Sequence, residues 1–145
     1  MKTNCIYIGQ NHDIKDKISL SKACGEMVHK IIPATALRYI YSKQNVDVVF
    51  WEIPDDTWHK YELVRFFKES LNKRVLLFLV VNDKDEQDKL LKAGADGVFD
   101  TGFDANKALT VDYLNQHQNE AISKRVAKKD YATFGQSLFE LFKAN

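Results

Sequence analysis

Near its middle the sequence reads Val75-Leu76-Leu77-Phe78-Leu79-Val80-Val81, an uninterrupted apolar run. A run of this length, bounded by polar residues, is typical of a strand that is buried on both faces. The next segment, Lys84 to Ala93, has helical spacing and stops at Gly94, a residue that suits a helix C-terminus. A short apolar segment, Gly97 to Phe99, comes directly afterwards. Strand, helix and strand in this order predict two parallel strands joined by a crossover helix.

The same alternation extends back to the N-terminus. Buried strands are predicted at Cys5 to Ile8 and at Val46 to Trp51, with a weaker one at Met27 to Ile31. Helical spacing predicts the intervening helices at Ile14 to Cys24 opened by Asp13, at Ala34 to Lys43 after Pro33, and at Trp58 to Leu71 capped by Asp56 or Thr57.

Five strands alternating with helices predict a three-layer α/β/α architecture, a flavodoxin-like five-stranded parallel sheet with helices on both faces. The chain of 145 residues fits one such domain, residues 1–116. Residues 117–145 are predicted to form a C-terminal helical extension. Its apolar positions recur every three or four residues and include Phe134, Leu138, Leu141 and Phe142. Such a face needs to be buried against its own domain, a second copy or another protein.

Composition narrows the classes of partner. The 21 Lys and Arg residues nearly balance the 20 Asp and Glu residues, so the formal net charge is +1. This balance provides no overall field to attract nucleic acid or an anionic membrane. No apolar run approaches the roughly 20 residues of a membrane span, and no signal-peptide pattern is visible. We therefore expect a cytoplasmic protein with neither nucleic acid nor membrane as its partner.

The two cysteines and four histidines do not suggest a metal centre or a disulfide framework. Cys5 falls in a predicted strand and Cys24 in a predicted helix, so both are expected to be reduced thiols. The histidines are scattered, and none has zinc-site spacing to another His or Cys. We expect no metal and no cofactor.

The stretch from Gly94-Ala95-Asp96 to Phe103 resembles the end of a CheY-like response-regulator receiver domain. In that family the last strand is followed by a lysine and a proline, and here Thr101 and Gly102 take those places. The resemblance covers the chain from Cys5 to about Leu114 in order, strand count and spacing. It implies a CheY-like fold.

The family's phosphoryl chemistry needs side chains that this sequence replaces. Two Mg²⁺-binding carboxylates after the first strand are replaced by Gly9-Gln10. The phosphoacceptor position falls on Glu52 when counted from Asp47, or on Phe50 when anchored on Pro54. The fourth-strand hydroxyl is replaced by Leu79, or by Val80 after a one-residue shift, and an apolar side chain cannot donate a hydrogen bond.

These replacements imply a degenerate member of the family, a pseudo-receiver that is not an enzyme and signals without aspartyl phosphorylation. A protein partner, an effector domain or a second copy of the chain would be the contact. By resemblance, the output face would include Val98, Phe99 and Phe103 together with the apolar residues of the C-terminal extension.

Two other functions stay open on the sequence. A small-ligand sensor would use the strand-end pocket, where the segment Gly9 to His12 offers amide and imidazole groups. An atypical phosphoacceptor would use Asp55, Asp56 or Asp100 at the same edge. The role of Glu52 is open as well, between a fixed-charge substitute for phosphoaspartate and a solvated carboxylate.

Overall fold

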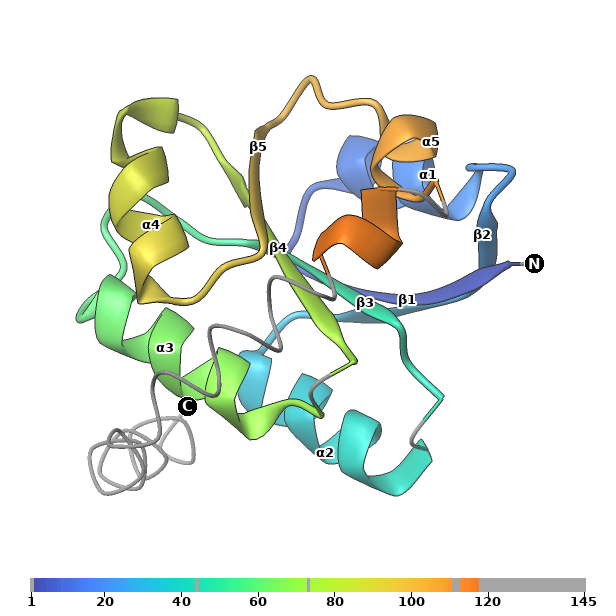
Figure 1. The fold of residues 1–145 in the computed structure, drawn as a ribbon, viewed down its shortest axis with the longest axis horizontal. Helices are drawn as coiled ribbons and strands as arrows, with labels where there is room; N and C mark the ends of the chain where they lie inside the picture. Colours follow the sequence, from blue (N-terminus) through green and yellow to red (C-terminus); the bar gives the residue numbers. More distant parts are fainter. Residues whose placement is uncertain (1, 44, 73, 111–112, 118–145) are drawn as a thin grey trace.

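The computed structural model describes residues 2–43, 45–72, 74–110 and 113–117, in which strands and helices alternate along the chain (Figure 1). The strands are β1 (Thr3–Ile8), β2 (Cys24–Lys30), β3 (Val48–Glu52), β4 (Leu76–Val81) and β5 (Gly97–Asp100). The helical elements are α1 (His12–Ser19), α2 (Pro33–Lys43), α3 (Lys60–Ser70), the 3-10 turn η1 (Lys84–Glu86), α4 (Gln87–Ala93) and α5 (Ala105–Ala108). Residues 113–117 are also helical.

All five strands are parallel and lie in the order β2-β1-β3-β4-β5. Helices α2, α3 and α4 cover one face of the sheet, while α1 and α5 cover the other (Figure 1). The predicted three-layer fold with a flavodoxin-like sheet is therefore confirmed. In this strand order the direction of connection reverses beside β1, so the carboxyl ends of β1 and β3 flank the place where such folds usually bind ligands.

Strand β4 shows how the two cores are divided. Every residue from Leu76 to Val81 is buried, as the apolar run predicted. Leu77, Leu79 and Val81 join the core beneath α2, α3 and α4, whereas Phe78 and Val80 join the core beneath α1 and α5. Because successive strand residues point to opposite faces, a central strand needs apolar side chains at every position.

The first helix is shorter than predicted. It ends at Ser19, and Cys24 opens strand β2 instead of lying on the helix. The apolar stripe of Ile14 and Ile18 stops there, since the next residue, Leu20, is 81% exposed. The N-cap also differs, because the side chain of Asn11 accepts hydrogen bonds from the backbone of the first turn in place of Asp13.

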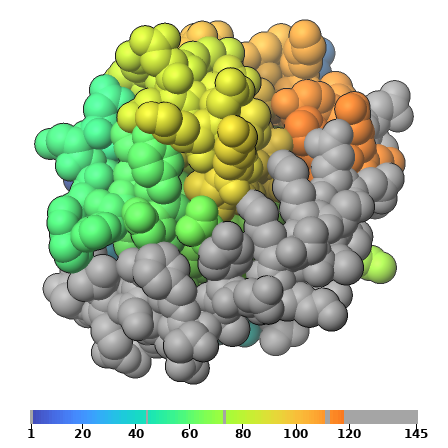
Figure 2. Space-filling view, turned by 60° about the vertical axis from the view of Figure 1, so that its left-hand side comes forward, coloured from blue at the N-terminus to red at the C-terminus, as the bar shows by residue number. Residues whose placement is uncertain are grey.

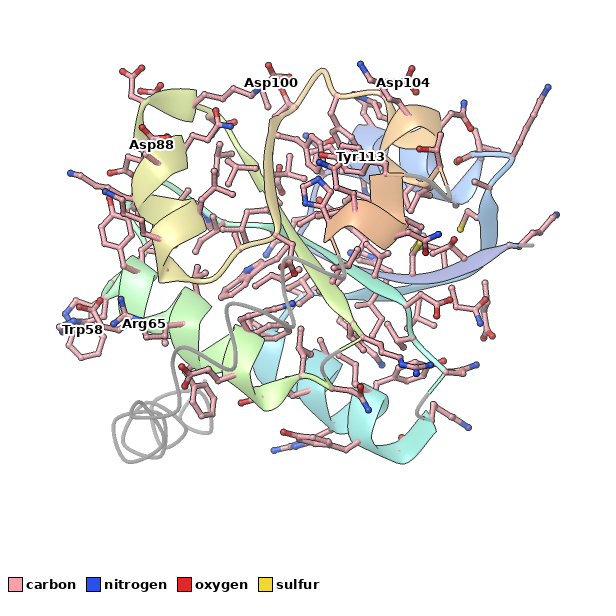
Figure 3. The ribbon with its side chains drawn as sticks, in the orientation of Figure 1. Trp58, Arg65, Asp88, Asp100, Asp104 and Tyr113 are labelled. Carbon is pink, nitrogen blue, oxygen red and sulfur yellow. The ribbon has the colours of Figure 1, made fainter. Side chains whose placement is uncertain are left out.

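Helix α3 begins later than predicted, and neither Asp56 nor Thr57 caps it. Its N-cap is His59, which has a left-handed backbone with φ of 51° and makes no side-chain capping bond. The Thr57 hydroxyl donates to the Pro54 carbonyl at 2.7 Å, within the preceding turn. Trp58 therefore lies outside the helix and is 65% exposed beside α3 (Figure 3).

The turn between α4 and β5 lies where it was predicted, and the structure shows the roles of Gly94 and Asp96 in it. Gly94 ends α4 with φ of 129°, a conformation that favours glycine. The buried carboxylate of Asp96 pairs with the buried ammonium of Lys68 and accepts from the Leu77 amide at 2.8 Å. Lys68 also donates to the Val75 carbonyl at 2.9 Å. This ion pair ties α3 to the sheet beside α4, and Figure 2 shows the face where these two helices meet.

The predicted C-terminal extension lies outside the described residues apart from His117. Within the part of the chain that the structure covers, no helix combines the length and apolar character needed to cross a bilayer.

Candidate functional site

The carboxyl ends of β1 and β3 bring two of the predicted positions together. Ile8 pairs with Trp51, so the residues that follow, Gly9 and Glu52, emerge next to each other. A Cβ atom added to Gly9 would lie 3.0 Å from the Cβ of Glu52. Gln10, the next residue of the predicted pocket, is exposed.

Tyr7 fills the space between these strand ends. Its side chain is fully buried, and its hydroxyl donates to Oε1 of Glu52 at 3.1 Å while accepting from the Asn11 amide at 3.0 Å. A Cβ on Gly9 would lie only 2.4 Å from the phenol oxygen and 2.7 Å from Cζ. Real Cβ atoms do not approach other atoms this closely. Glycine at position 9 is therefore required by the ring that passes beside it.

The phenol of Tyr7 is held in its neutral form. The pKa of Tyr7 is raised to about 12, chiefly by burial; the hydrogen bond from the Asn11 amide opposes this, while the negative charge and hydrogen bond of Glu52 add to it. A neutral phenol can donate to the carboxylate and accept from the amide at the same time. The Asn11 amide, the Tyr7 hydroxyl and the Glu52 carboxylate thus form one chain of hydrogen bonds.

His29 on β2 supports the ring of Tyr7 from the other side. The two rings stack with centroids 5.4 Å apart and an interplanar angle of 17°. Nε2 of His29 lies 2.6 Å from the Gly9 carbonyl oxygen, and because a carbonyl only accepts, this nitrogen carries the proton. Strands β2, β1 and β3 each contribute one side chain to the network.

Strand β4 brings Val80 to this face and turns Leu79 away. Val80 pairs with Glu52 in the sheet and belongs to the same core as Tyr7. Leu79 lies in the core on the opposite face, with Trp51. Of the two positions that the sequence offered for the family's hydroxyl, the structure thus places Val80 at the pocket. Its isopropyl group has no hydrogen-bond donor.

Beyond β5, a lysine is present but it comes from α1. The exposed Thr101 accepts a hydrogen bond at its carbonyl from Nζ of Lys17 at 2.8 Å, and the same Nζ lies 4.8 Å from the ring centroid of Phe103. The Lys17 ammonium therefore binds the loop after β5, through this hydrogen bond and through a cation–π contact with Phe103. No described contact joins it to Glu52.

Two carboxylates near this end of the sheet, those of Asp100 and Asp104, have local structural roles. Asp100 accepts from the Gly102 amide at 2.9 Å and so shapes the loop after β5. Asp104 caps α5 through the amides of its first turn. Both residues lie at the same rim of the molecule in Figure 3. Asp55 and Asp56 are exposed in the turn after β3.

The family whose fold this chain resembles holds Mg²⁺ at this edge, and the residues here do not fit that ion. Mg²⁺ needs several oxygen ligands, usually carboxylates. Position 9 has no side chain, Gln10 supplies an exposed amide, and the Glu52 carboxylate already accepts from Tyr7. Among the described residues, no group of three His, Cys, Asp or Glu side chains is placed to hold a metal ion.

The predicted output residues that the structure describes are largely packed inside. Val98 is buried in the core under α4, and Phe103 is buried against Phe50 with ring centroids 5.5 Å apart. Phe99 is half-buried and contacts the rings of Phe78 and Phe103. The remaining output residues, Phe134, Leu138, Leu141 and Phe142, lie outside the described residues.

At the strand ends, where the sequence suggested a small-ligand pocket, the buried ring of Tyr7 lies beside Gly9. A cavity of about 570 Å³ lies at the opposite end of the strands, between the C-terminal ends of α2 and α3. Its lining includes Tyr41, Asp47, Asn72 and Arg74 above an apolar floor. The segment Gly9 to His12 is not part of that lining.

The central residue of the site, Tyr7, was missed by sequence reasoning. One signal was available: Tyr7 is the polar-tipped member of the otherwise apolar run Cys5 to Ile8, and a buried phenol needs a hydrogen-bond partner. It also stands two positions before Gly9, so both point to the same face of the sheet. The identity of the partner, Glu52, depended on the pairing of β1 with β3.

Response regulators and receiver domains are among the solved structures similar to this chain. DrrB of Thermotoga maritima, an OmpR/PhoB homolog, is 19% identical with a TM-score of 0.55, and the match covers 75% of this chain and 50% of DrrB. A receiver domain protein from Clostridium thermocellum is 14% identical with a TM-score of 0.54, covering 88% and 98%. An orphan response regulator of H. pylori is 15% identical with a TM-score of 0.55, covering 83% and 96%.

This chain thus spans about half the length of DrrB and nearly the whole of the other two. At these identities the likeness shows the fold, which is that of a CheY-like receiver domain. No protein-family model matches the sequence, and no curated protein matches it.

Proposed function

We propose that this chain is a receiver-like regulatory domain that acts through protein contacts, has no enzymatic activity and does not undergo aspartyl phosphorylation. The observation that carries the proposal is the hydrogen bond between Tyr7 and Glu52 at the strand ends. It uses the acceptor-position carboxylate and fills the volume beside it with an aromatic ring. The likeness to receiver folds makes regulation the class of function to test.

Phosphoryl transfer depends on positioned charge, because the transferred group carries negative charge that has to be neutralised. Here the β3 end supplies Glu52 instead of an aspartate, Val80 offers no hydroxyl, and Thr101 offers no cation. The nearby ammonium of Lys17 is engaged with the Thr101 carbonyl. An incoming phosphoryl group would thus find the Glu52 carboxylate bonded to Tyr7, and the group's negative charge would not be neutralised by a cation at position 101.

A protein partner or effector domain would bind the surface around α4, β5 and α5. The apolar residues Val98 and Phe103 are internal there, so the contact would be made by exposed polar groups. The exposed residues of this surface include Asp88, Lys89, Lys92, Asp100, Thr101, Asp104, Asn106 and Lys107. Their mixed charges fit a polar protein contact better than a nucleic-acid contact, which would need a clustered positive field.

The proposal is tested by incubating the full chain with acetyl phosphate and Mg²⁺ and recording the intact mass, with an active receiver domain as the positive control. We expect no phosphoryl adduct on the wild-type chain. The variant Glu52→Asp supplies the missing acceptor, and we expect it to stay unmodified as well because Val80 and Thr101 are unchanged. An adduct on either protein would show that the remaining groups support phosphorylation, and the proposal would fail.

A further inference from the structure

The two cysteines of this chain meet on neighbouring strands, although helix α1 separates them in the sequence. Cys5 lies on β1 and Cys24 opens β2, where Thr3 pairs with Cys24 and Cys5 pairs with Met27 across a register irregularity. Both side chains are buried in the same core cluster. Cys5 stands two positions along β1 from Thr3, the residue that pairs with Cys24, and its Sγ donates to the Thr3 carbonyl oxygen at 3.7 Å. The sequence contains two cysteines in all, so both lie in this one cluster.

The surroundings make the two thiols chemically unequal. The neighbouring Cys5 thiol lowers the pKa of the Cys24 thiol, burial opposes this, and the positive charge of Lys2 lowers it further, to about 7 in all. The proximity of Cys24, together with burial and the negative charge of Asp47, raises the pKa of Cys5. Since the thiolate is the reactive form of cysteine, Cys24 is the nucleophile and Cys5 is the resolving thiol.

We propose that Cys5 and Cys24 form a redox-modification site that a peroxide converts into an intrachain disulfide. The Cys24 thiolate attacks one peroxide oxygen, the O–O bond breaks, and Cys24 is oxidised to a sulfenic acid while the peroxide is reduced. The sulfur of Cys5 then attacks the sulfur of Cys24. The S–S bond forms as the S–O bond breaks, and the departing oxygen leaves as water with the Cys5 proton. Two thiols and one hydrogen peroxide thus give one disulfide and two waters.

The location of the pair allows this bond to form and gives it a structural effect. A disulfide requires the two sulfurs to approach to about 2.05 Å, so the start of β2 has to move toward β1. Strand β2 is at the edge of the sheet, and the register irregularity beside Cys5 gives the backbone room to adjust. A labile disulfide of this kind is the redox-responsive type rather than a structural staple.

The turn before Cys24 connects this movement to α5. The Cys24 amide donates to the Ser21 carbonyl at 3.1 Å, and the Ser21 hydroxyl donates to Oδ1 of Asn106 at 2.7 Å. The Lys22 amide donates to the same oxygen at 3.1 Å. Asn106 lies in α5, so a shift of Cys24 is transmitted to a helix of the proposed contact surface. The redox site is separate from the strand-end network, and it does not depend on the proposed function.

The test is intact mass measured on the reduced full chain after titration with hydrogen peroxide. We expect the monomer to lose two hydrogens, roughly 2 Da, and to regain them with dithiothreitol. Peptide mapping without reductant should join the peptides of Cys5 and Cys24, and this result needs no variant. Addition of oxygen without loss of hydrogen, or a disulfide between two chains, would overturn the proposal.

Two variants assign the roles of the thiols once their circular dichroism shows that they fold. In Cys5→Ser we expect a sulfenic acid on Cys24 that dimedone traps, because the resolving thiol is gone. In Cys24→Ser we expect little reaction, since the remaining thiol is protonated. Equal reactivity of the two variants would contradict the assigned roles. In NMR spectra of the oxidised chain, an unchanged Asn106 signal would contradict the link to α5.

Discussion

Tyr7 and Glu52 meet across the β1–β3 pair, with the phenol oxygen 3.1 Å from Oε1, although 45 positions separate them in the sequence. The phenol also accepts from the Asn11 amide, and His29 stacks on its ring. Glu52, which the resemblance to receiver domains aligns with the phosphoacceptor position, is thereby part of the protein's own hydrogen-bond network. This relationship makes the site testable through stability and titration as well as through phosphorylation.

Replacement of Tyr7 by Phe should lower the free energy of unfolding by roughly 1 to 2 kcal/mol, because the Asn11 amide and the Glu52 carboxylate both lose their partner. Urea unfolding followed by circular dichroism measures the change. The control is Tyr41→Phe, which removes an exposed hydroxyl bonded to the Ser70 carbonyl at 3.0 Å. Equal losses of unfolding free energy in the two variants would show that the buried hydrogen bonds of Tyr7 stabilise the fold no more than one exposed hydrogen bond does.

Titration of the tyrosines should reveal a phenol with a pKa of about 12 that is absent in Tyr7→Phe. The folded-state pKa lies above the unfolded value of about 10, so the stabilisation is complete below pH 10 and disappears as pH rises through 12. The absorbance difference between wild type and variant isolates Tyr7 from Tyr61, whose pKa is also raised, chiefly by its hydrogen bond with Glu86. A difference curve centred near pH 10 would contradict the buried network.

Replacement of Gly9 by Ala should displace the ring of Tyr7, since the new Cβ would lie 2.4 Å from the phenol oxygen. Overpacking of this kind typically costs about 1–3 kcal/mol. The matched control is Gly102→Ala, whose Cβ would meet Oδ1 of Asp100 at an ordinary 3.4 Å. Thermal and urea unfolding should show a clearly larger loss of stability in Gly9→Ala than in Gly102→Ala. Similar stability would mean that Gly9 is not needed for close approach.

Replacement of the buried Lys68 by Met should lower the free energy of unfolding by about 3–5 kcal/mol, because it leaves the buried Asp96 carboxylate without its cation. The control, Lys107→Met, removes an exposed ammonium on α5. Chemical unfolding of both variants provides the comparison. A loss for Lys68→Met no larger than that of the control would refute the role given to the Lys68–Asp96 pair.

Much of the fold could be predicted from the sequence because its strands are marked by apolar runs. The run from Val75 to Val81 is a buried central strand, and Gly94 ends a helix as its backbone freedom suggests. The N-terminal boundaries were harder to predict. The segment around Cys24 was expected to be helical, but the apolar stripe ends after Ile18 and the chain turns into β2.

The site could be predicted only in outline. Gly9 and Glu52 were placed at one strand-end edge from the order of elements, and the structure brings them together. The bond between Tyr7 and Glu52 depends on which strands are neighbours and on which face each residue points to, and no local pattern encodes that. The proximity of Cys5 and Cys24 was missed for the same reason, and also because Cys24 was expected on a helix instead of on β2.

The central claim is tested most directly by amide NMR spectra of the full chain with and without Mg²⁺ and beryllofluoride, which mimics an aspartyl phosphate. We expect the signals of Gly9, Asn11 and Glu52 to stay in place, because the carboxylate and the space around it are already occupied by Tyr7. Saturable shifts confined to these residues and to the loop after β5 would demonstrate a working phosphoryl site and contradict the account.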